Sequence, residues 1–356
     1  MLCNLRYEFM NNISETKNQH FIPRFLLKNF SWCINPSQKK KRQKFKVFFT
    51  TISDPSQKKD INRIACSDYF YEEEVLGDVE IEKQLSEREN RYARSLNIVL
   101  DRSIIEKSQY QIISNFIFNL TWRTENNRVL MTSIMQNGFE GVAIDMMSDK
   151  REIAKIQNKA FDDYVYEHGV NADRNQKAKF MQRASPILTA DMNEKMNNLL
   201  ENELPYLMKN FASSTQSKLV TQDNFVSHPV MSKVIWEMRT VELPLILGDV
   251  GPIGFCNKSG ACGPLFWMVA STNIDYIYLP ISPYKYLVGS PSGVGLDNFS
   301  STHTVDSLNI LSAQQSYTFY ISNEEDVSDQ YSSFLGDTHS NYQNDWSLQS
   351  LRMLVN

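Results

Sequence analysis

Apolar residues recur at helical spacing through the middle of the chain, between residue 79 and about residue 211. Two stripes predict helices, one of Ile81, Leu85, Tyr92, Leu96 and Val99, and one over about 105–131 of Ile112, Phe116, Leu120 and Leu130. Further helical patterns cover about 139–168 and 187–211, and Pro205 is expected to kink or end the last of them.

Short β-rich runs separated by glycine and proline replace the helical spacing from about residue 216. The expected strands are Val234–Val241, Leu243–Leu247, Phe266–Ala270, Asp275–Ile281, Tyr286–Val288 and Tyr317–Ile321. Val305–Gln315 has the spacing of a helix, and near the N-terminus the apolar run Phe45–Ile52 predicts one more strand.

These elements predict an α+β fold. A mixed or antiparallel sheet is expected from N-terminal and C-terminal strands, with a large helical insertion packed against it. We expect a single domain over 17–322, in which the insertion covers about 79–211 and the β-rich part about 216–322. The acidic, polar tail over 323–356 is expected to be loosely ordered.

The segment Gln19–Phe30 combines a histidine with a proline-led apolar run. Pro23 suits the first position of a helix, where its missing N–H costs nothing. His20 then precedes the helix start, close to N–H groups without a partner inside the helix and to the positive end of the helix dipole. This position favours anion binding or acid–base chemistry, while a capping or core imidazole is the structural alternative.

The same segment resembles the N-terminal signature of a mostly bacterial family described only as domain of unknown function 4238. Later landmarks follow in the family's order: Ile64-Ala65, Asp68–Tyr71, Ile81-Glu82 with Glu89, Arg123-Thr124 with Arg128, Leu247–Pro252, Leu279–Pro283 and Leu308-Asn309. The chain departs from the pattern at Glu125, where proline is usual, and at Gly251, which separates Asp249 from Pro252. The resemblance spans roughly residues 17–322 and implies no activity, so the chemistry must be argued from the residues.

The composition, with 42% hydrophobic and 22% charged residues, is ordinary for a soluble globular protein. No apolar run approaches the ~20 residues of a membrane span, and Met1–Met10 lacks the apolar region of a signal peptide. The five cysteines, Cys3, Cys33, Cys66, Cys256 and Cys262, are scattered and are expected to be reduced thiols. We therefore expect a cytoplasmic protein with no membrane partner.

Charge is unevenly distributed, because residues 1–64 carry 13 Lys and Arg against 4 Asp and Glu, whereas residues 240–356 carry 3 against 11. The near-copies Asn35–Lys40 and Asp54–Lys59 flank the expected N-terminal strand. Lys40 and Arg42 lie in the first basic run and are candidates to contact nucleic-acid phosphates. An exposed hairpin tip, whose charge complements the acidic C-terminal part, is the alternative.

Two helices carry charges where their apolar stripes predict hydrophobic residues. Glu82 and Glu89 are seven residues apart and nearly superpose on the first helix, and Arg123 lies among the apolar directions of the second. Because an isolated buried charge is costly, these side chains are expected to pair or to line a cavity. They form either a structural Glu–Arg–Glu network or the wall of a polar cleft in which Arg123 grips an anion.

Asp249 follows the apolar run Leu243–Leu247 in a Gly-Asp-Val-Gly-Pro turn. A carboxylate on a loop at the end of a buried strand is a common position for a catalytic or ligand-binding group. A turn residue that bonds nearby backbone is the alternative.

Together these residues suit hydrolysis of a phosphodiester. The predicted catalytic residues are His20, Glu89, Arg123 and Asp249, and the predicted substrate contacts are Gln19, Glu82, Arg128, Lys40 and Arg42. His20 would be the acid or base, Arg123 would stabilise phosphate charge, and the two carboxylates would orient water or hold a divalent metal ion.

We therefore expect a nuclease-like hydrolase, such as a toxin or defence effector, with nucleic acid as its partner. The competing hypothesis is a non-catalytic ligand-binding or sensing protein with a structural charge network. The sequence leaves the metal requirement and the oligomeric state open.

Overall fold

The computed structural model of the chain describes residues 18–68, 70, 79–169, 173–221, 231–257, 259–270, 274–291 and 295–337. These residues fall into two compact units. The first is formed by the chain up to Leu130 together with the chain from Ser213 onward, and the second by Met131–Ala212. Antiparallel sheets and a large helical region confirm the α+β class.

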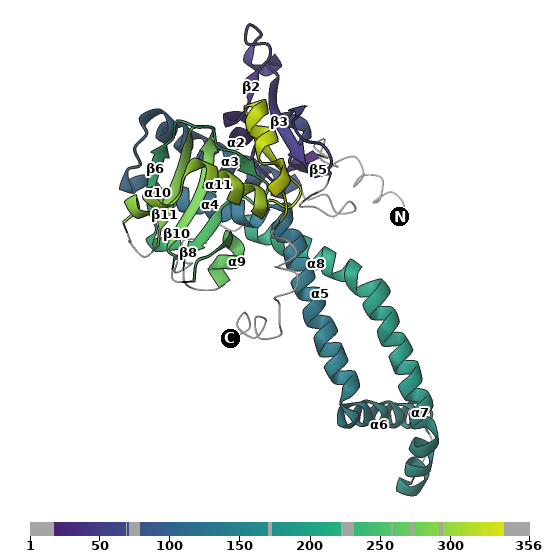
Figure 1. The fold of residues 1–356 in the computed structure, drawn as a ribbon. Coiled ribbons are helices and arrows are strands. Elements are labelled where there is room, and N and C mark those ends of the chain that lie inside the picture. The colour runs from purple at the N-terminus through teal and green to yellow at the C-terminus, as the bar shows by residue number, and fades with distance from the viewer. Residues whose placement is uncertain are drawn as a thin grey trace. The chain divides into compact units, whose positions relative to one another are not determined.

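One sheet of the first unit joins the two ends of the chain (Figure 1). Its strands run in the order β2 (Trp32–Cys33), β3 (Phe45–Thr51), β12 (Phe319–Ser322) and β7 (Leu247–Gly248), and β4 (Gln57–Asp60) also pairs with β3. All of these pairings are antiparallel. The expected sheet of N-terminal and C-terminal strands is therefore present.

A second antiparallel sheet is built from the C-terminal part alone, and a two-stranded ladder carries His20. The second sheet runs β6 (Ile235–Thr240), β11 (Lys285–Ser290), β10 (Tyr276–Ser282), β8 (Ile253–Cys256) and β9 (Ala261–Pro264). The ladder pairs β1 (Asn18–His20) with β5 (Cys66–Asp68), with His20 opposite Cys66.

The second sheet is covered on both faces, which explains why β10 is almost wholly apolar. The covering helices are α2 (Arg24–Asn29), α3 (Val79–Arg102), α4 (Tyr110–Arg123), α10 (Asp297–Thr302) and α11 (Val305–Gln315). Since side chains alternate along a strand, Ile277 and Leu279 join the core formed with α2, α3 and α4, whereas Tyr276 and Tyr278 join the core formed with α10 and α11. Figure 1 shows α10 and α11 over one face of this sheet.

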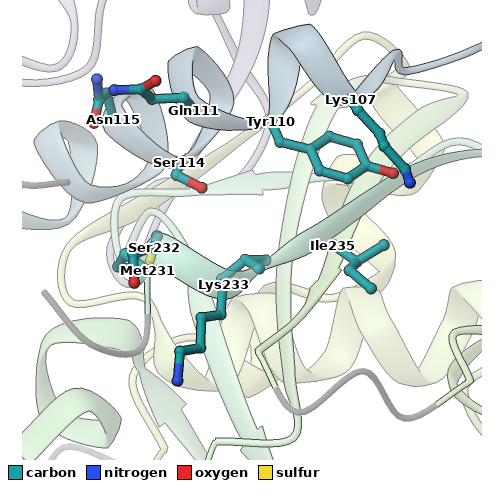
Figure 2. Close-up of a pocket in the computed structure, with 10 residues that line it drawn as sticks. Lys107, Tyr110, Gln111, Ser114, Asn115, Met231, Ser232, Lys233 and Ile235 are labelled. Carbon is teal, nitrogen blue, oxygen red and sulfur yellow. The ribbon is translucent and has the colours of Figure 1, made fainter. Parts of the chain in front are cut away.

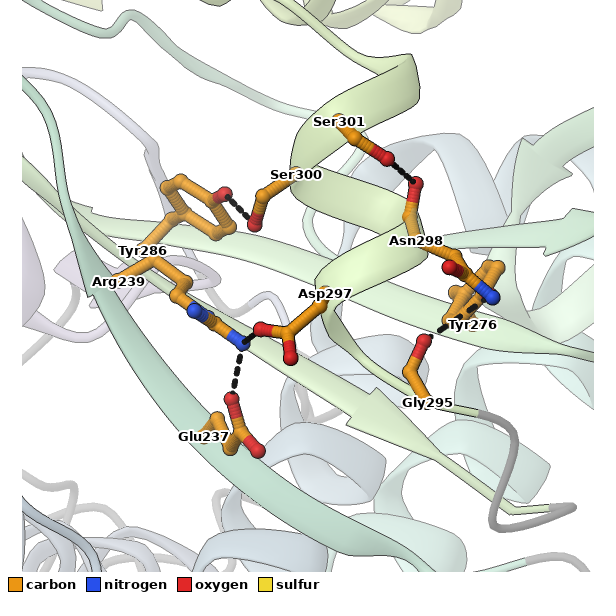
Figure 3. A network of polar contacts seen from close by, with 9 residues as sticks. All are labelled: Glu237, Arg239, Tyr276, Tyr286, Gly295, Asp297, Asn298, Ser300 and Ser301. Carbon is orange, nitrogen blue, oxygen red and sulfur yellow. Dashed lines mark hydrogen bonds and ion pairs between the residues drawn. The ribbon is translucent and has the colours of Figure 1, made fainter.

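Polar contacts fasten α10 to the sheet edge (Figure 3). Arg239 on β6 donates to Asp297 at 2.7 Å and also pairs with Glu237 on its own strand. The Tyr286 hydroxyl lies 3.1 Å from the hydroxyl of Ser300. Arg239 is partly exposed, so these ion pairs orient α10 more than they stabilise it.

The second unit consists of helices. Its elements are the greater part of α5 (Glu125–Ser148) and the first half of α8 (Leu204–Thr221), together with α6 (Lys150–Glu167), α7 (Arg174–Asn198) and the π-helical turn Leu199–Glu203. Contact between α6 and α7 includes the rings of Phe161 and Phe180, 5.0 Å apart. Among the described residues, no helix has both the length and the apolarity required to cross a membrane.

Several expected boundaries were wrong in the helical region. The helix expected over 105–131 breaks at Thr124, which is extended (φ −67°, ψ 145°), so α4 ends at Arg123 and α5 begins at Glu125. Thr124 acts as the N-cap of α5, because its hydroxyl accepts the N–H of Asn127 at 3.3 Å. The helix expected over 187–211 does not end at Pro205, but its regular α-helical hydrogen bonding is interrupted just before that proline, because the π-helical turn Leu199–Glu203 separates α7 from α8.

In the C-terminal part, the run expected as a strand over Phe266–Ala270 is helix α9 (Leu265–Ala270). A short apolar run does not distinguish a buried strand from a buried helix. Strands β8 and β9 pair with each other over residues 253–264, and Leu243–Leu247 contributes only its last residue to β7.

The beginning of the expected tail is ordered. Helix α12 (Glu325–Gln330) packs beside β3, and the hydroxyls of Ser328 and Thr50 are hydrogen bonded in the interior. Residues 338–356, the rest of the expected tail, lie outside the described residues.

Gly289 on β11 provides a test of the packing between β11 and the neighbouring strand β6. A methyl group added there would lie 2.6 Å from the Trp236 ring and from a methyl of Val234. Gly289→Ala is therefore expected to lower the free energy of unfolding by about 1–3 kcal/mol, measured by urea denaturation. Gly295→Ala is the matched control, because nothing lies within 4 Å of its added methyl. Equal midpoints for the two variants would contradict the described packing.

Candidate functional site

The guanidinium of Arg123 is the centre of a buried polar cluster in the first unit. Arg123 ends α4, its side chain is only 2% exposed, and its Nη2 lies 2.6 Å from Oε1 of Glu89 on α3. The same nitrogen donates to the backbone carbonyl of His20 at 2.7 Å. The expected pairing of Arg123 with one of two glutamates is thus present with Glu89, which retains 24% exposure. The side chain of Glu82 lies outside the described residues.

His20 is held at the end of β1 as a half-buried, neutral imidazole. Its Nε2 lies 3.3 Å from the carbonyl oxygen of Ile61. Because a carbonyl can only accept, Nε2 must carry the hydrogen, which leaves Nδ1 as the basic nitrogen of the neutral ring. Burial lowers the pKa of His20, the Ile61 carbonyl opposes this, and the nearby positive charges of Arg24 and Arg123 lower it further.

Arg128 fastens the start of α5 to distant chain segments. Its Nε donates to the side-chain oxygen of Gln216 at 2.8 Å, its Nη2 donates to the Phe70 carbonyl, and its guanidinium stacks over the Phe70 ring at 3.6 Å. Gln216 in turn donates to the carbonyl of Trp122 at 2.6 Å. Gln216 was not predicted as a structural residue, because the sequence around it does not distinguish a buried glutamine that bridges two segments from an exposed one.

Asp249 is fully buried and is saturated by one chain segment. Its Oδ1 accepts the N–H of Tyr317 at 2.6 Å, and its Oδ2 accepts the N–H of Thr318 at 2.7 Å, the Thr318 hydroxyl at 2.6 Å and the N–H of Phe319 at 3.2 Å. Burial raises the pKa of the Asp249 carboxyl, and these donors oppose the shift. Such contacts anchor the turn before β12, and no part of this carboxylate faces a substrate.

Glu125 is a second acidic group at the start of α5, at the position where the family pattern has proline. Burial raises the pKa of the Glu125 carboxyl, the charge of Asp249 raises it further, and Arg128 opposes both. Burial is the main cause of both shifts, since it lowers the pKa of a base such as His20 and raises that of an acid such as Glu125.

The predicted site residues are thus brought together in part. Arg123 contacts both Glu89 and the backbone carbonyl of His20. His20 connects to the segment held by Asp249 only through its neighbour Phe21, whose ring lies 6.2 Å from that of Phe319. Gln19 is 1% exposed, so its side chain lies in the interior and offers no surface to a substrate.

Lys40 and Arg42 are exposed in the short helix η1 (Lys40–Arg42), within the loop of residues 34–44, here named the basic loop. The loop is held by Asn35, whose Oδ1 accepts the N–H of Lys44 at 2.6 Å and whose Nδ2 donates to the carbonyl of Arg42 at 3.0 Å. Gln43 adds a hydrogen bond of 3.1 Å to the carbonyl of Pro36. The loop therefore presents its cations from an ordered backbone.

Strand register places the basic loop at the same end of β3 as Ile61, the residue whose carbonyl contacts His20. Lys46 of β3 lies opposite both Trp32 of β2 and Asp60 of β4. The basic loop ends just before β3, next to Lys46. Ile61 directly follows Asp60 at the same end, and its carbonyl contacts His20. The near-copy Asp54–Lys59 begins at the opposite end of β3, as expected.

The positive charges of Lys58 and Lys59, in the second near-copy, have partners within the protein. Lys58 pairs with Glu325 at 3.3 Å and lies over the ring of Phe48, and Lys59 lies 4.4 Å from the ring centroid of Phe49. By contrast, within the part of the chain that the structure describes, Lys39, Lys40, Arg42 and Lys44 form no ion pair.

No cluster of three or more His, Cys, Asp or Glu side chains suited to a metal ion occurs among the described residues. Cys33, Cys66, Cys256 and Cys262 are thiols, as expected, and Cys3 lies outside the described residues.

Comparison with known proteins identifies the family of the chain. The model of a family described as "Protein of unknown function (DUF4238)" matches residues 18–326. Neither a curated protein nor a solved structure matches the chain significantly.

Removing the buried guanidinium is expected to be costly. Arg123→Met keeps an apolar stem but leaves Glu89 and the His20 carbonyl without their donor, so it should lower the free energy of unfolding by about 3–5 kcal/mol in urea denaturation. Arg102→Met is the control, because its ion pair with Glu106 is 64% and 60% exposed and should contribute less than about 1 kcal/mol. Similar losses in both variants would contradict a special role for the Arg123 cluster.

The raised pKa of Glu125 predicts a pH-dependent effect on stability. The folded protein binds this proton more tightly than the unfolded chain, so the stabilisation is present at low pH and is lost as pH rises through the folded-state pKa. Glu125→Gln should therefore stabilise the protein relative to wild type above about pH 6 and lose this advantage below about pH 4. Urea denaturation midpoints of wild type and Glu125→Gln, measured between about pH 4 and about pH 6, test this prediction, and Glu87→Gln, at an exposed position, is the control. A difference between the wild-type and Glu125→Gln midpoints that does not change with pH would refute the prediction.

Proposed function

The chain belongs to the DUF4238 family, and we propose that it is a nucleic-acid-binding phosphodiester hydrolase in which His20 is the general base. One observation carries this proposal: the half-buried imidazole of His20, whose pKa is lowered by burial, contacts the carbonyl of Ile61 at the same end of β3 from which the basic loop projects. The loop would hold a polyanion, and His20 would act on it.

The binding step rests on the charges of the basic loop. Lys39, Lys40, Arg42 and Lys44 are exposed on a backbone held by Asn35, so they can contact phosphates without first breaking an internal ion pair. Each phosphate contact releases condensed counterions, which makes such binding strongly dependent on salt. A regularly charged polymer satisfies several of these side chains at once, which favours nucleic acid over an isolated anion.

The chemical step rests on the orientation of His20. With Nε2–H donated to Ile61, Nδ1 accepts a proton from the attacking water as the new P–O bond forms. The imidazolium then returns the proton to the leaving oxygen as the original P–O bond breaks. Arg123 is a positioning residue in this proposal, because it holds the His20 carbonyl and is itself aligned by Glu89.

A second candidate is a binding protein without turnover. The saturation of Asp249 by residues 317–319 favours it, because that carboxylate is committed to holding the fold. Under this hypothesis the basic loop still binds nucleic acid, and His20 only caps the end of β1.

Purified protein incubated with labelled single-stranded RNA and DNA, with and without Mg²⁺, separates the two candidates. Hydrolysis is expected from wild type and from His168→Gln, whose exposed imidazole contacts only its own helix among the described residues. His20→Gln should lose activity by about 10²-fold or more while binding the strand with unchanged affinity. Equal cleavage by His20→Gln would refute the role of His20, and binding without cleavage by wild type would favour the second candidate.

The same strands test the basic loop. Replacing Lys39, Lys40 and Arg42 with Gln should lower affinity and reduce the slope of log K against log salt by up to about 2, for three single-strand phosphate contacts. The charge-matched control replaces the exposed Lys83, Lys159 and Lys179 with Gln. If both triple variants lose the same affinity and the same salt slope, the net charge of the protein explains the binding and the basic loop has no special role. Inducible expression in bacteria, followed by profiling of cellular nucleic acids, would then test the toxin or defence role.

A further inference from the structure

We propose that a cavity beside the first turn of α4 binds a small phosphate ester, independently of the nucleic-acid site. The cavity has a volume of about 300 Å³ and lies between η3 (Lys107–Gln109) with α4 on one side and η6 (Met231–Lys233) with the start of β6 on the other. This volume is at the lower end of the range for small-molecule sites. Figure 2 shows side chains of both walls around the opening.

The charge of the lining is positive and uncompensated. Lys107 and Lys233 come from opposite walls, and none of the described lining residues carries a carboxylate. The nearest acid in sequence, Glu106, is engaged elsewhere, since its carboxylate accepts Nη1 of Arg102 at 3.2 Å. Neither lysine forms an ion pair within the described chain, and both side chains are exposed. Figure 2 shows the Lys233 ammonium directed away from the space between the walls, so this flexible side chain must turn to reach an anion bound there.

A buried hydroxyl provides directional recognition. Ser114 is 7% exposed, lines the cavity, and its Oγ accepts the indole N–H of Trp236 at 2.8 Å. Because the acceptor side of this hydroxyl is occupied by Trp236, its own hydrogen can be donated to a ligand. Figure 2 shows the Ser114 hydroxyl directed into the space between the two walls. Gln111 and Asn115 add amide groups on the same helix.

The remaining lining selects an ester over a bare ion. Met231 and Val234 are buried and form an apolar floor, and the ring of Tyr110 lies on the opposite wall. An inorganic phosphate would engage the lysines and leave this apolar surface in contact with water. A phosphate carried by a flat or apolar group, as in a nucleoside monophosphate, uses both parts of the lining.

Isothermal titration of the full chain with AMP, inorganic phosphate and adenosine tests the proposal. AMP should bind more tightly than either of the other two probes, and its saturation should raise the melting temperature by mass action. The double variant Lys107→Gln/Lys233→Gln should weaken AMP binding by about tenfold or more, because both phosphate contacts lose their charge. The charge-matched control Lys83→Gln/Lys159→Gln should leave it unchanged.

Gln111→Trp provides a second test that does not alter charge, because this exposed lining position can carry a ring that fills the cavity. It should abolish AMP binding while the urea midpoint stays close to that of wild type. Absence of AMP binding to wild type, equal weakening in the control lysine variant, or adenosine binding as tight as AMP would each overturn the proposal. Loss of strand cleavage in His20→Gln with intact AMP binding separates this site from the proposed hydrolase site.

Discussion

The burial of the Arg123 guanidinium is the constraint on which the arrangement of the first unit depends. A cation that is 2% exposed must recover its lost hydration from the protein, and it does so with Glu89 of α3 and the His20 carbonyl of β1. These partners come from segments far apart in sequence, so one side chain fixes a helix end, a second helix and the N-terminal strand together. The position of the His20 ring follows from this contact, because its backbone is held on one side and its Nε2 is held by Ile61 on the other.

Asp249 is a buried anion that, like the buried cation of Arg123, replaces its lost hydration with hydrogen bonds from the protein. Its carboxylate gathers three successive N–H groups and one hydroxyl from residues 317–319, directly before β12 joins β3 and β7. The N-terminal and C-terminal strands are therefore closed into one sheet by a buried anion. The charged residues that the sequence analysis assigned to one catalytic site therefore serve two separate structural contacts, one around Arg123 and one around Asp249. His20 is the member of the set whose ring nitrogen Nδ1 is not used in these contacts.

Periodicity predicted the elements whose local pattern agrees with their environment. Val305–Gln315 is a helix over the expected range, and β10 and β11 were found because their apolar residues are dense and bounded by turns. The pairing of Arg123 with Glu89 was predictable, since both break an apolar stripe. The partners of Asp249 were not, because backbone N–H groups some 70 residues away leave no mark on the sequence around it. The break at Thr124 was also missed, since a single capping residue barely disturbs the spacing of a long helix.

The two near-identical basic loops show why sequence similarity within a chain does not establish equal function. Lys58 and Lys59 belong to a β-strand beside aromatic rings, and Lys58 has a carboxylate partner in α12, so their charge is largely used within the molecule. The basic loop has a closely similar composition but extends beyond the sheet, where the side chains of Asn35 and Gln43 and the loop's own backbone hydrogen bonds hold it and its exposed cations face water. The two loops thus differ in the residues that surround them in the folded protein, although their sequences are nearly the same. These surroundings determine which loop has lysine and arginine side chains available to a binding partner. The surviving charge lies at the same end of β3 as Ile61, which contacts the His20 ring, and this arrangement supports the proposal that the basic loop and His20 act on one polyanion.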